Sequence, residues 1–158
     1  MPKKVIRIYA DTSVFGGVFD EEFERPSRAF FDQVREGKFV LVVSALVREE
    51  LSEAPEKVRK LFEEIAEISE VVGITEEAIL LQQSYIRHGI VGHSAMADAL
   101  HVAEATVASC RAIVSWNFRH IVHLDKISLY NGVNRSQGYF EIDIHSPHEV
   151  IAYEDQDI

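Results

Sequence analysis

Three acidic residues, Asp11, Glu50 and Asp98, stand where their carboxylates could work together. Asp11 directly follows an apolar run at residues 5–10, which predicts a strand buried on both faces, and two hydroxyl residues come next. Open parallel sheets bind their ligands at such strand ends. Converging carboxylates repel one another unless a hard cation such as Mg²⁺ or Mn²⁺ neutralises them. A cation held in this way lowers the pKa of bound water and stabilises charge on a phosphoryl oxygen.

Ordinary structural roles are also open to these side chains. Asp is common at helix N-caps and turns, and Thr12 and Ser13 could cap the next turn instead of ordering a metal-bound water. Asp98 differs because it lies among the small and apolar residues 95–100, where a buried carboxylate needs a partner, a proton or a cation. His101, three residues further on, could share a helix face with Asp98, but we expect it to be a structural, hydrogen-bonded histidine.

Alternating strands and helices provide the framework. Apolar runs predict strands at residues 5–10, 39–43, 71–74, 112–115 and 140–144. Apolar stripes and capping residues predict helices from Pro26 to Gly37, from Ser44 past Leu51, from Pro55, and over 75–89 and 94–109. Turns are expected at Gly16-Gly17, Asn131-Gly132 and Gln137-Gly138. This order predicts an α/β fold with a mostly parallel sheet of about five strands, flanked by helices on both faces.

In that framework all three carboxylates reach one edge of the sheet. Asp11 lies at the end of the first strand, and Glu50 lies in the first turns of the helix after the second strand. Asp98 lies in the first turns of the helix before the fourth strand. Because the carboxyl ends of parallel strands share an edge, the sequence predicts a single acidic site there.

Length and composition indicate one globular domain. The chain has 158 residues, 47% of them hydrophobic, and its single cysteine, Cys110, is expected to be buried and inert. No apolar stretch approaches the roughly 20 residues of a membrane span, and the N-terminus lacks an export signal, so we expect a cytoplasmic protein. The net charge of −10 argues against non-specific coating of nucleic acid but allows a local site. We expect a domain at 1–150 and an acidic tail at 151–158.

Four short motifs, taken in order, resemble the PIN-domain ribonucleases and in particular the VapC-type toxins of bacterial toxin-antitoxin pairs. The motifs are Tyr9-Ala10-Asp11-Thr12-Ser13, Ser44 followed by Glu50-Leu51, Asp98-Ala99-Leu100-His101-Val102-Ala103, and Val114-Ser115-Trp116-Asn117. The resemblance covers nearly the whole chain. It implies a PIN-like single domain, cleavage of RNA, and binding of Mg²⁺ or Mn²⁺ by Asp11, Glu50 and Asp98.

Two of the motifs need comment. Glu49 is an alternative to Glu50, but the glutamate of the family directly precedes leucine, which favours Glu50. Many relatives carry further aspartates in the fourth motif, whereas this chain has Asn117 and His120. An amide can orient a metal-bound water but adds no charge, so the site is expected to hold fewer ions. The basic stretch at 119–126 is either a contact to the RNA backbone or a solvated surface.

The sequence thus favours a metal-dependent endoribonuclease in which Asp11, Glu50 and Asp98 hold the ion and Asn117 steadies the ion or its water. One alternative is a PIN-like protein-binding module without turnover, which the uncharged Asn117 favours. Another is a phosphatase with Asp11 as covalent nucleophile, which lacks the second aspartate that such sites place two residues on.

The resemblance also implies partners besides RNA. It implies a homodimer and a small antitoxin whose segment covers the acidic pocket, and a basic tip on that segment would complement the carboxylates. We expect the partner-facing apolar surface on the helices that carry Phe30, Phe31, Val58, Leu61 and Phe62.

Overall fold

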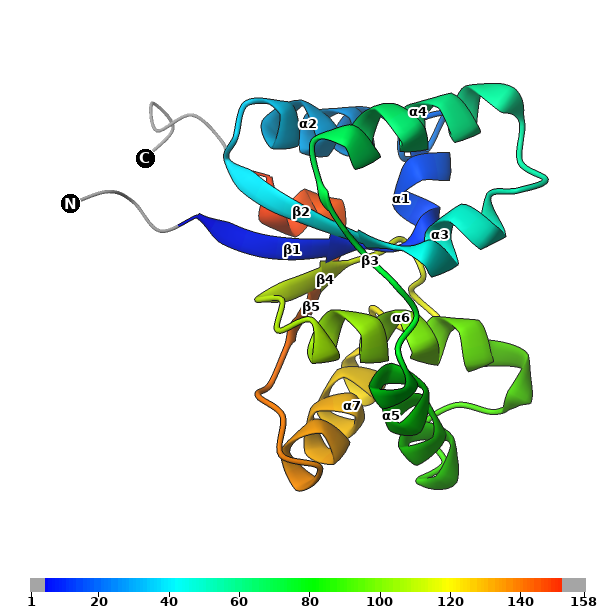
Figure 1. Cartoon of the computed structure of the whole chain (residues 1–158), viewed down its shortest axis with the longest axis vertical. Helices are drawn as coiled ribbons and strands as arrows, with labels where there is room; N and C mark the ends of the chain where they lie inside the picture. Colours follow the sequence, from blue (N-terminus) through cyan, green and yellow to red (C-terminus); the bar gives the residue numbers. More distant parts are fainter. Residues whose placement is uncertain (1–4, 152–158) are drawn as a thin grey trace.

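The computed structural model describes residues 5–151, which form an α/β unit built on one sheet. The strands are β1 (Ile6–Ala10), β2 (Phe39–Ser44), β3 (Glu70–Val72), β4 (Ala112–Val114) and β5 (Asp143–His145). All are parallel, in the order β3-β2-β1-β4-β5 (Figure 1). This confirms the predicted fold class. The predicted acidic tail, apart from Ile151, lies outside the described residues.

Helices cover both faces of the sheet (Figure 1). One face carries α1 (Thr12–Gly17), α2 (Glu24–Arg35), α4 (Glu56–Glu67) and the short α8 (Pro147–Val150), which contacts α2. The other face carries α5 (Glu76–Arg87), α6 (Met96–Val107) and α7 (Leu124–Ser136). The short α3 (Ala45–Glu50) follows β2, and a single 3₁₀ turn, η1 (His93–Ala95), leads into α6. Within residues 5–151 no helix combines the length and the apolar character needed to cross a bilayer.

Burial of the sheet on both faces explains why its central strands β1, β2 and β4 are largely apolar. Along β1, Ile8 and Ala10 belong to the core beneath α1, α2 and α4, whereas Tyr9 between them belongs to the core beneath α5, α6 and α7. This alternation is the two-residue period of a strand, with both sets of side chains removed from water. Cys110 is buried as predicted, and burial raises the pKa of its thiol to about 12.

The apolar surface predicted for partners is wrong. The aromatic and aliphatic side chains of α2 and α4 face inward and fill the core between these helices and the sheet. Their exposed fractions lie between 0% and 9%, for Phe30, Phe31, Val58, Leu61 and Phe62. The stripe that the sequence shows is the inner face of two amphipathic helices, which pack against their own sheet.

Two predicted turns lie inside helices instead. Asn131-Gly132 falls within α7, where the Asn131 side chain bonds to both the backbone N–H and the carbonyl of Ile142. Gly17 is the last residue of α1, and glycine is required there because a Cβ would meet Ser27 Oγ at 2.6 Å and Trp116 Nε1 at 2.7 Å. In both cases a tertiary contact overrides the local turn signal. The last strand is also shorter than predicted, since β5 begins at Asp143.

The strand order places a topological switch between β1 and β4. From β1 the chain moves to β2 and β3 on one side, then returns to β4 and β5 on the other. Open α/β sheets bind ligands in the crevice beyond the carboxyl ends of the strands at such a point. The backbone N–H of Asp11 donates to the carbonyl of Val114 at 3.2 Å, so Asp11 lies at the carboxyl ends of β1 and β4, at this switch point.

Candidate active site

Asp11 is held in a cradle of hydrogen-bond donors. It is the N-cap of α1, and its Oδ1 accepts from the backbone N–H of Ser13 at 3.1 Å and from the Ser13 hydroxyl at 2.6 Å. Its Oδ2 accepts from the Ser115 hydroxyl at 2.5 Å. Asp11 is 4% exposed, and this burial raises its pKa, while His101 and the hydroxyl donors act to lower it and Asp98 acts to raise it. The carboxylate is therefore fixed in place by neutral donors, and no cationic side chain forms a hydrogen bond with it among the described residues.

Glu50 lies at the end of α3 and contacts Thr12, the residue after Asp11. The helix has only six residues, so Glu50 is its last residue and does not lie in the first turns of a longer helix. Its Oε1 accepts from the Thr12 hydroxyl at 2.5 Å and faces Nε2 of His101 at 2.5 Å. Burial acts to raise the pKa of Glu50, but His101 and Thr12 together hold it below its ordinary value. These contacts place Glu50, rather than its neighbour Glu49, at the site.

Asp98 lies in the first turn of α6 and is paired with Asn117. Burial raises the pKa of Asp98, and the Glu50 charge adds to this, whereas the hydrogen bond with the Asn117 side chain and the charge of His120 act to lower it. The Asn117 Oδ1 accepts from the backbone N–H groups of Arg119 at 3.2 Å and His120 at 2.9 Å. Its oxygen is thus committed to its own loop, and the amide nitrogen is the group left to donate to Asp98.

Asp98 is electrostatically coupled to each of the other two carboxylates. Asp98 raises the pKa of Asp11, and Glu50 raises that of Asp98. Even so, no group of three or more His, Cys, Asp or Glu side chains within residues 5–151 is arranged to hold a metal ion by itself. Mg²⁺ is usually bound through one or two carboxylates, with water and substrate phosphate completing its octahedron. The carboxylate oxygens of Asp11, Glu50 and Asp98 are suitable ligands for such a partly hydrated ion, and its positive charge would offset their negative charge.

Sequence reasoning located the carboxylates but missed most of their supports. His101 is the hydrogen-bonded histidine that was expected, yet its contact with Glu50 was not foreseen. Ser44 precedes α3 as expected but makes no capping bond, and its hydroxyl pairs with that of Tyr9 at 2.7 Å. The role of Ser115 had a visible signal, because Ser115 follows β4 just as Asp11 follows the neighbouring β1.

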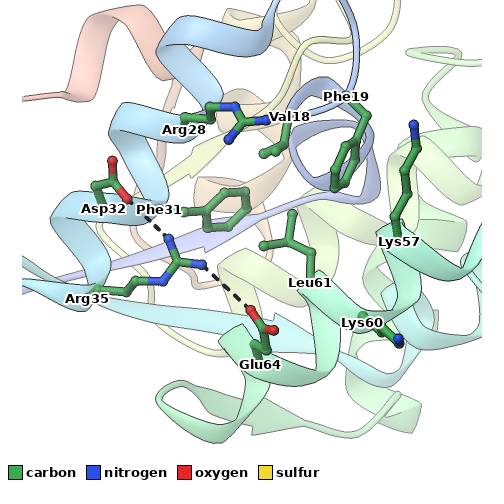
Figure 2. Close-up of a pocket in the computed structure, with 10 residues that line it drawn as sticks. All are labelled: Val18, Phe19, Arg28, Phe31, Asp32, Arg35, Lys57, Lys60, Leu61 and Glu64. Carbon is green, nitrogen blue, oxygen red and sulfur yellow. Dashed lines mark hydrogen bonds and ion pairs between the residues drawn. The ribbon is translucent and has the colours of Figure 1, made fainter.

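A separate cleft lies between α2 and α4 (Figure 2). Its lining mixes apolar and charged side chains and contains none of the three carboxylates: Val18, Phe19, Arg28, Phe31, Asp32, Arg35, Lys57, Lys60, Leu61 and Glu64. Arg35 pairs with Asp32 at 3.1 Å and Glu64 at 3.9 Å, and the Lys57 ammonium lies 5.0 Å from the centre of the Phe19 ring. Both carboxylates of the lining are paired with Arg35, and Arg28, Lys57 and Lys60 give the cleft an excess of positive charge.

Comparison with solved structures supports the fold. No protein-family model and no curated protein sequence matches the chain. FitAcB from Neisseria gonorrhoeae superposes with a TM-score of 0.59 at 16% identity, covering 90% of this chain and 99% of that one. VapBC2 from Rickettsia felis, bound to a DNA fragment from their promoter, superposes with a TM-score of 0.56 at 11% identity, covering 89% and 98%. The likeness confirms the PIN-like fold that the motifs predicted.

Proposed function

We propose that this protein is a metal-dependent endoribonuclease that hydrolyses phosphodiester bonds in RNA. One observation carries the proposal: Asp11, Glu50 and Asp98 come from three separate segments of the chain, and Asp98 is electrostatically coupled to both of the others near the switch point of the sheet. The pKa values of the buried Asp11 and the partly buried Asp98 are both raised, which is costly to the fold, and such groups cluster at functional sites.

Each site residue has a role that its contacts support. Asp11, Glu50 and Asp98 would hold Mg²⁺ or Mn²⁺, which when bound lowers the pKa of water and stabilises charge on a phosphoryl oxygen. Ser115 fixes Oδ2 of Asp11 through a 2.5 Å hydrogen bond. Asn117 steadies Asp98 through its side-chain hydrogen bond and so acts on the ion indirectly. Direct contact between Asn117 and the ion would require its amide oxygen to leave two backbone donors.

We further infer that the protein is the toxin of a toxin-antitoxin pair in the cytoplasm. Its motifs resemble VapC-type toxins, and the similar solved structures FitAcB and VapBC2 support a partner protein encoded with it. A basic segment of that antitoxin could pair with the acidic site, where a buried cation would neutralise the same carboxylates. The resemblance also supports a homodimer, although the surface first expected to mediate it is buried.

A non-catalytic binding module is the competing proposal. The position of Asn117, with its oxygen turned to the backbone, leaves one negative charge fewer than in many relatives. A phosphatase with Asp11 as nucleophile is disfavoured because Ser13, not a second aspartate that could act as the acid, stands two residues on, and its hydroxyl donates to Oδ1 of Asp11.

Cleavage of end-labelled single-stranded RNA with and without Mn²⁺ tests the proposal. Wild-type protein should cut only with the metal, and Asp98→Asn should lower the rate by about 100-fold or more, because several kcal/mol of charge stabilisation is lost. Asp32→Asn is the matched control, since Asp32 is an exposed acid on α2 and pairs with Arg35. An Asp98→Asn protein that cuts like the control would defeat the proposal. Metal binding without any cleavage would favour the binding module.

A further inference from the structure

A line of buried hydrogen bonds runs from the core of the sheet to Glu50. The Ser44 hydroxyl lies 2.7 Å from the Tyr9 hydroxyl, which lies 2.7 Å from Nδ1 of His101. The other ring nitrogen, Nε2, lies 2.5 Å from Oε1 of Glu50. Ser44 and Tyr9 are fully buried and His101 is 2% exposed, whereas the side chain of Glu50 is 32% exposed. The line therefore joins the dry interior to a carboxylate at the mouth of the site.

Donors and acceptors in this line match at every atom. A carboxylate only accepts, so Nε2 of His101 carries a hydrogen and donates it to Glu50. With a neutral ring, Tyr9 donates to Nδ1 and its oxygen accepts from Ser44. With a doubly protonated ring, the Tyr9 hydroxyl turns and donates to Ser44. Both arrangements keep the Nε2 hydrogen bond to Glu50, so the orientation of the ring does not depend on its charge.

The contacts to Glu50 are one-sided. His101 and Thr12 both act on Oε1, and neither hydrogen bond uses Oε2. A half-buried glutamate at the end of a helix ordinarily samples several rotamers, and two donors on one oxygen select among them. The carboxylate is thereby presented with its second oxygen available for a ligand.

We propose that Ser44, Tyr9 and His101 are positioning residues that fix Glu50 through Oε1 and so leave Oε2 for the divalent cation. The inference rests on the proposed function, because it assigns a purpose to Glu50 at that site. Partners that orient a metal-binding carboxylate commonly change metal affinity by about 10- to 100-fold when they are removed. His101 orients Glu50 from a position within the core.

Two substitutions of His101 separate positioning from packing. The amide nitrogen of His101→Gln can reach the position of Nε2 and donate to Glu50, whereas His101→Leu fills the space without a donor. If His101 only packs, leucine should serve at least as well as glutamine in this apolar setting. If it positions Glu50, calorimetry with Mn²⁺ should show affinity falling about 10- to 100-fold for His101→Leu and largely retained by His101→Gln. A leucine variant that binds Mn²⁺ as tightly as the glutamine variant would overturn the inference.

A pair of tyrosine variants provides the matched control. Tyr9→Phe and Tyr85→Phe each remove one fully buried phenol hydroxyl, and that of Tyr85 donates to Asn134 on α7, away from Glu50. Both variants should lower the melting temperature, since each leaves at least one buried polar group unpaired. Only Tyr9→Phe should also weaken Mn²⁺ binding. Equal Mn²⁺ affinity in the two variants would count against a role for this line of hydrogen bonds in positioning Glu50.

The line can also be tested without metal. Ring ¹⁵N–¹H spectra of the metal-free protein should show a hydrogen on Nε2 of His101, and a ring protonated only on Nδ1 would overturn the inference by itself. Absence of Mn²⁺ binding by the unmodified protein would overturn both the inference and the proposed metal chemistry. If the wild-type protein binds Mn²⁺ but His101→Gln and His101→Leu bind it equally well, the inference fails and the proposed metal chemistry stands.

Discussion

The Ser115 hydroxyl and Oδ2 of Asp11 are 2.5 Å apart, although the two residues are separated by 104 positions in the sequence. Both follow the ends of adjacent strands, β4 and β1, so the register of the sheet brings them together. The same serine oxygen accepts from the backbone N–H of Asn117 at 2.9 Å. A single hydroxyl thus connects the first carboxylate of the site to the loop that carries Asn117.

Ser115→Ala should therefore weaken Mn²⁺ binding in a pH-dependent way. The Ser115 hydrogen bond lowers the pKa of Asp11, so its loss raises that pKa further and lets protons compete better with the metal. Calorimetry should show affinity about 10-fold lower at acidic pH, as expected for losing a hydrogen bond to a charged group, with the difference shrinking as the pH rises. Ser69→Ala is the control, because its hydroxyl bonds to the Ile65 carbonyl on α4. A pH-independent loss would point to a displaced loop instead.

Asp98→Asn should stabilise the metal-free protein. The raised pKa of Asp98 means that its contribution to stability is present below its ordinary pKa of 3.8 and is lost as pH rises through the folded-state value. Asparagine keeps the shape and avoids this cost. Thermal melts in a chelator should show the variant matching wild type near pH 4 and melting a few degrees higher at pH 8. With Mn²⁺ added the order should reverse, because only wild type gains by mass action.

Sequence reasoning recovered the sheet because its signals are local. Continuous apolar runs marked the strands, and Asp11 and Asp98 were placed correctly by their positions after a strand and at a helix start. The failures involve contacts between distant segments. The Gly16-Gly17 pair suggests a turn by composition. The sequence around Gly17 does not reveal that the Trp116 ring occupies the space next to its Cα.

The candidate site shows the same division. Residue type and motif position suffice to nominate a carboxylate, but not to say which of its oxygens is engaged. The link from Tyr9 through His101 to Glu50 joins β1, α6 and α3, and it depends on side-chain rotamers that no spacing encodes. The buried faces of α2 and α4 were mistaken for a partner surface, because an amphipathic stripe does not reveal what covers it.

Glu104 should make stability depend on pH independently of the three site carboxylates. It lies in α6, is 2% exposed, and within residues 5–151 its Oε1 is a buried side-chain atom without a hydrogen-bond partner. Burial raises its pKa from 4.5 to about 7. The folded state then holds a proton that the unfolded state has released, so stability falls as pH rises from 4.5 to about 7 and levels off above that.

Glu104→Gln mimics the protonated side chain and should remove this loss. At about 1.4 kcal/mol per pKa unit, the variant should gain about 3 kcal/mol over wild type between pH 4 and pH 8, measured by urea unfolding in a chelator. Glu67→Gln, an exposed change on α4, should track wild type at both pH values. A constant offset between Glu104→Gln and wild type would show that Glu104 does not titrate in this range.

Adjacent glycines of α1 should respond oppositely to alanine. At Gly17 a Cβ would lie 2.6 Å from Ser27 Oγ and 2.7 Å from Trp116 Nε1, which are themselves hydrogen-bonded at 2.9 Å. Gly17→Ala should cost about 1–3 kcal/mol of stability through overpacking. At Gly16 a Cβ meets nothing within 4 Å, so Gly16→Ala should be neutral or gain up to about 1 kcal/mol from helix propensity. Urea unfolding of the two variants compares them directly, and equal costs would show that the Trp116 contact is not tight.

Asn117→Asp should make the metal-free and metal-bound proteins respond in opposite directions. The Asn117 side chain hydrogen-bonds to Asp98, so an aspartate there replaces a donor with a second carboxylate. Repulsion should lower the melting temperature in a chelator by a few degrees, whereas a further carboxylate should tighten Mn²⁺ binding. Calorimetry and paired melts measure the two effects. Asn117→Ala is the control, because it loses the same donor without adding charge. It should lower both the melting temperature in a chelator and the affinity for Mn²⁺. If Asn117→Asp binds Mn²⁺ no better than Asn117→Ala, position 117 lies too far from the ion to bear on its charge, and its influence ends at Asp98.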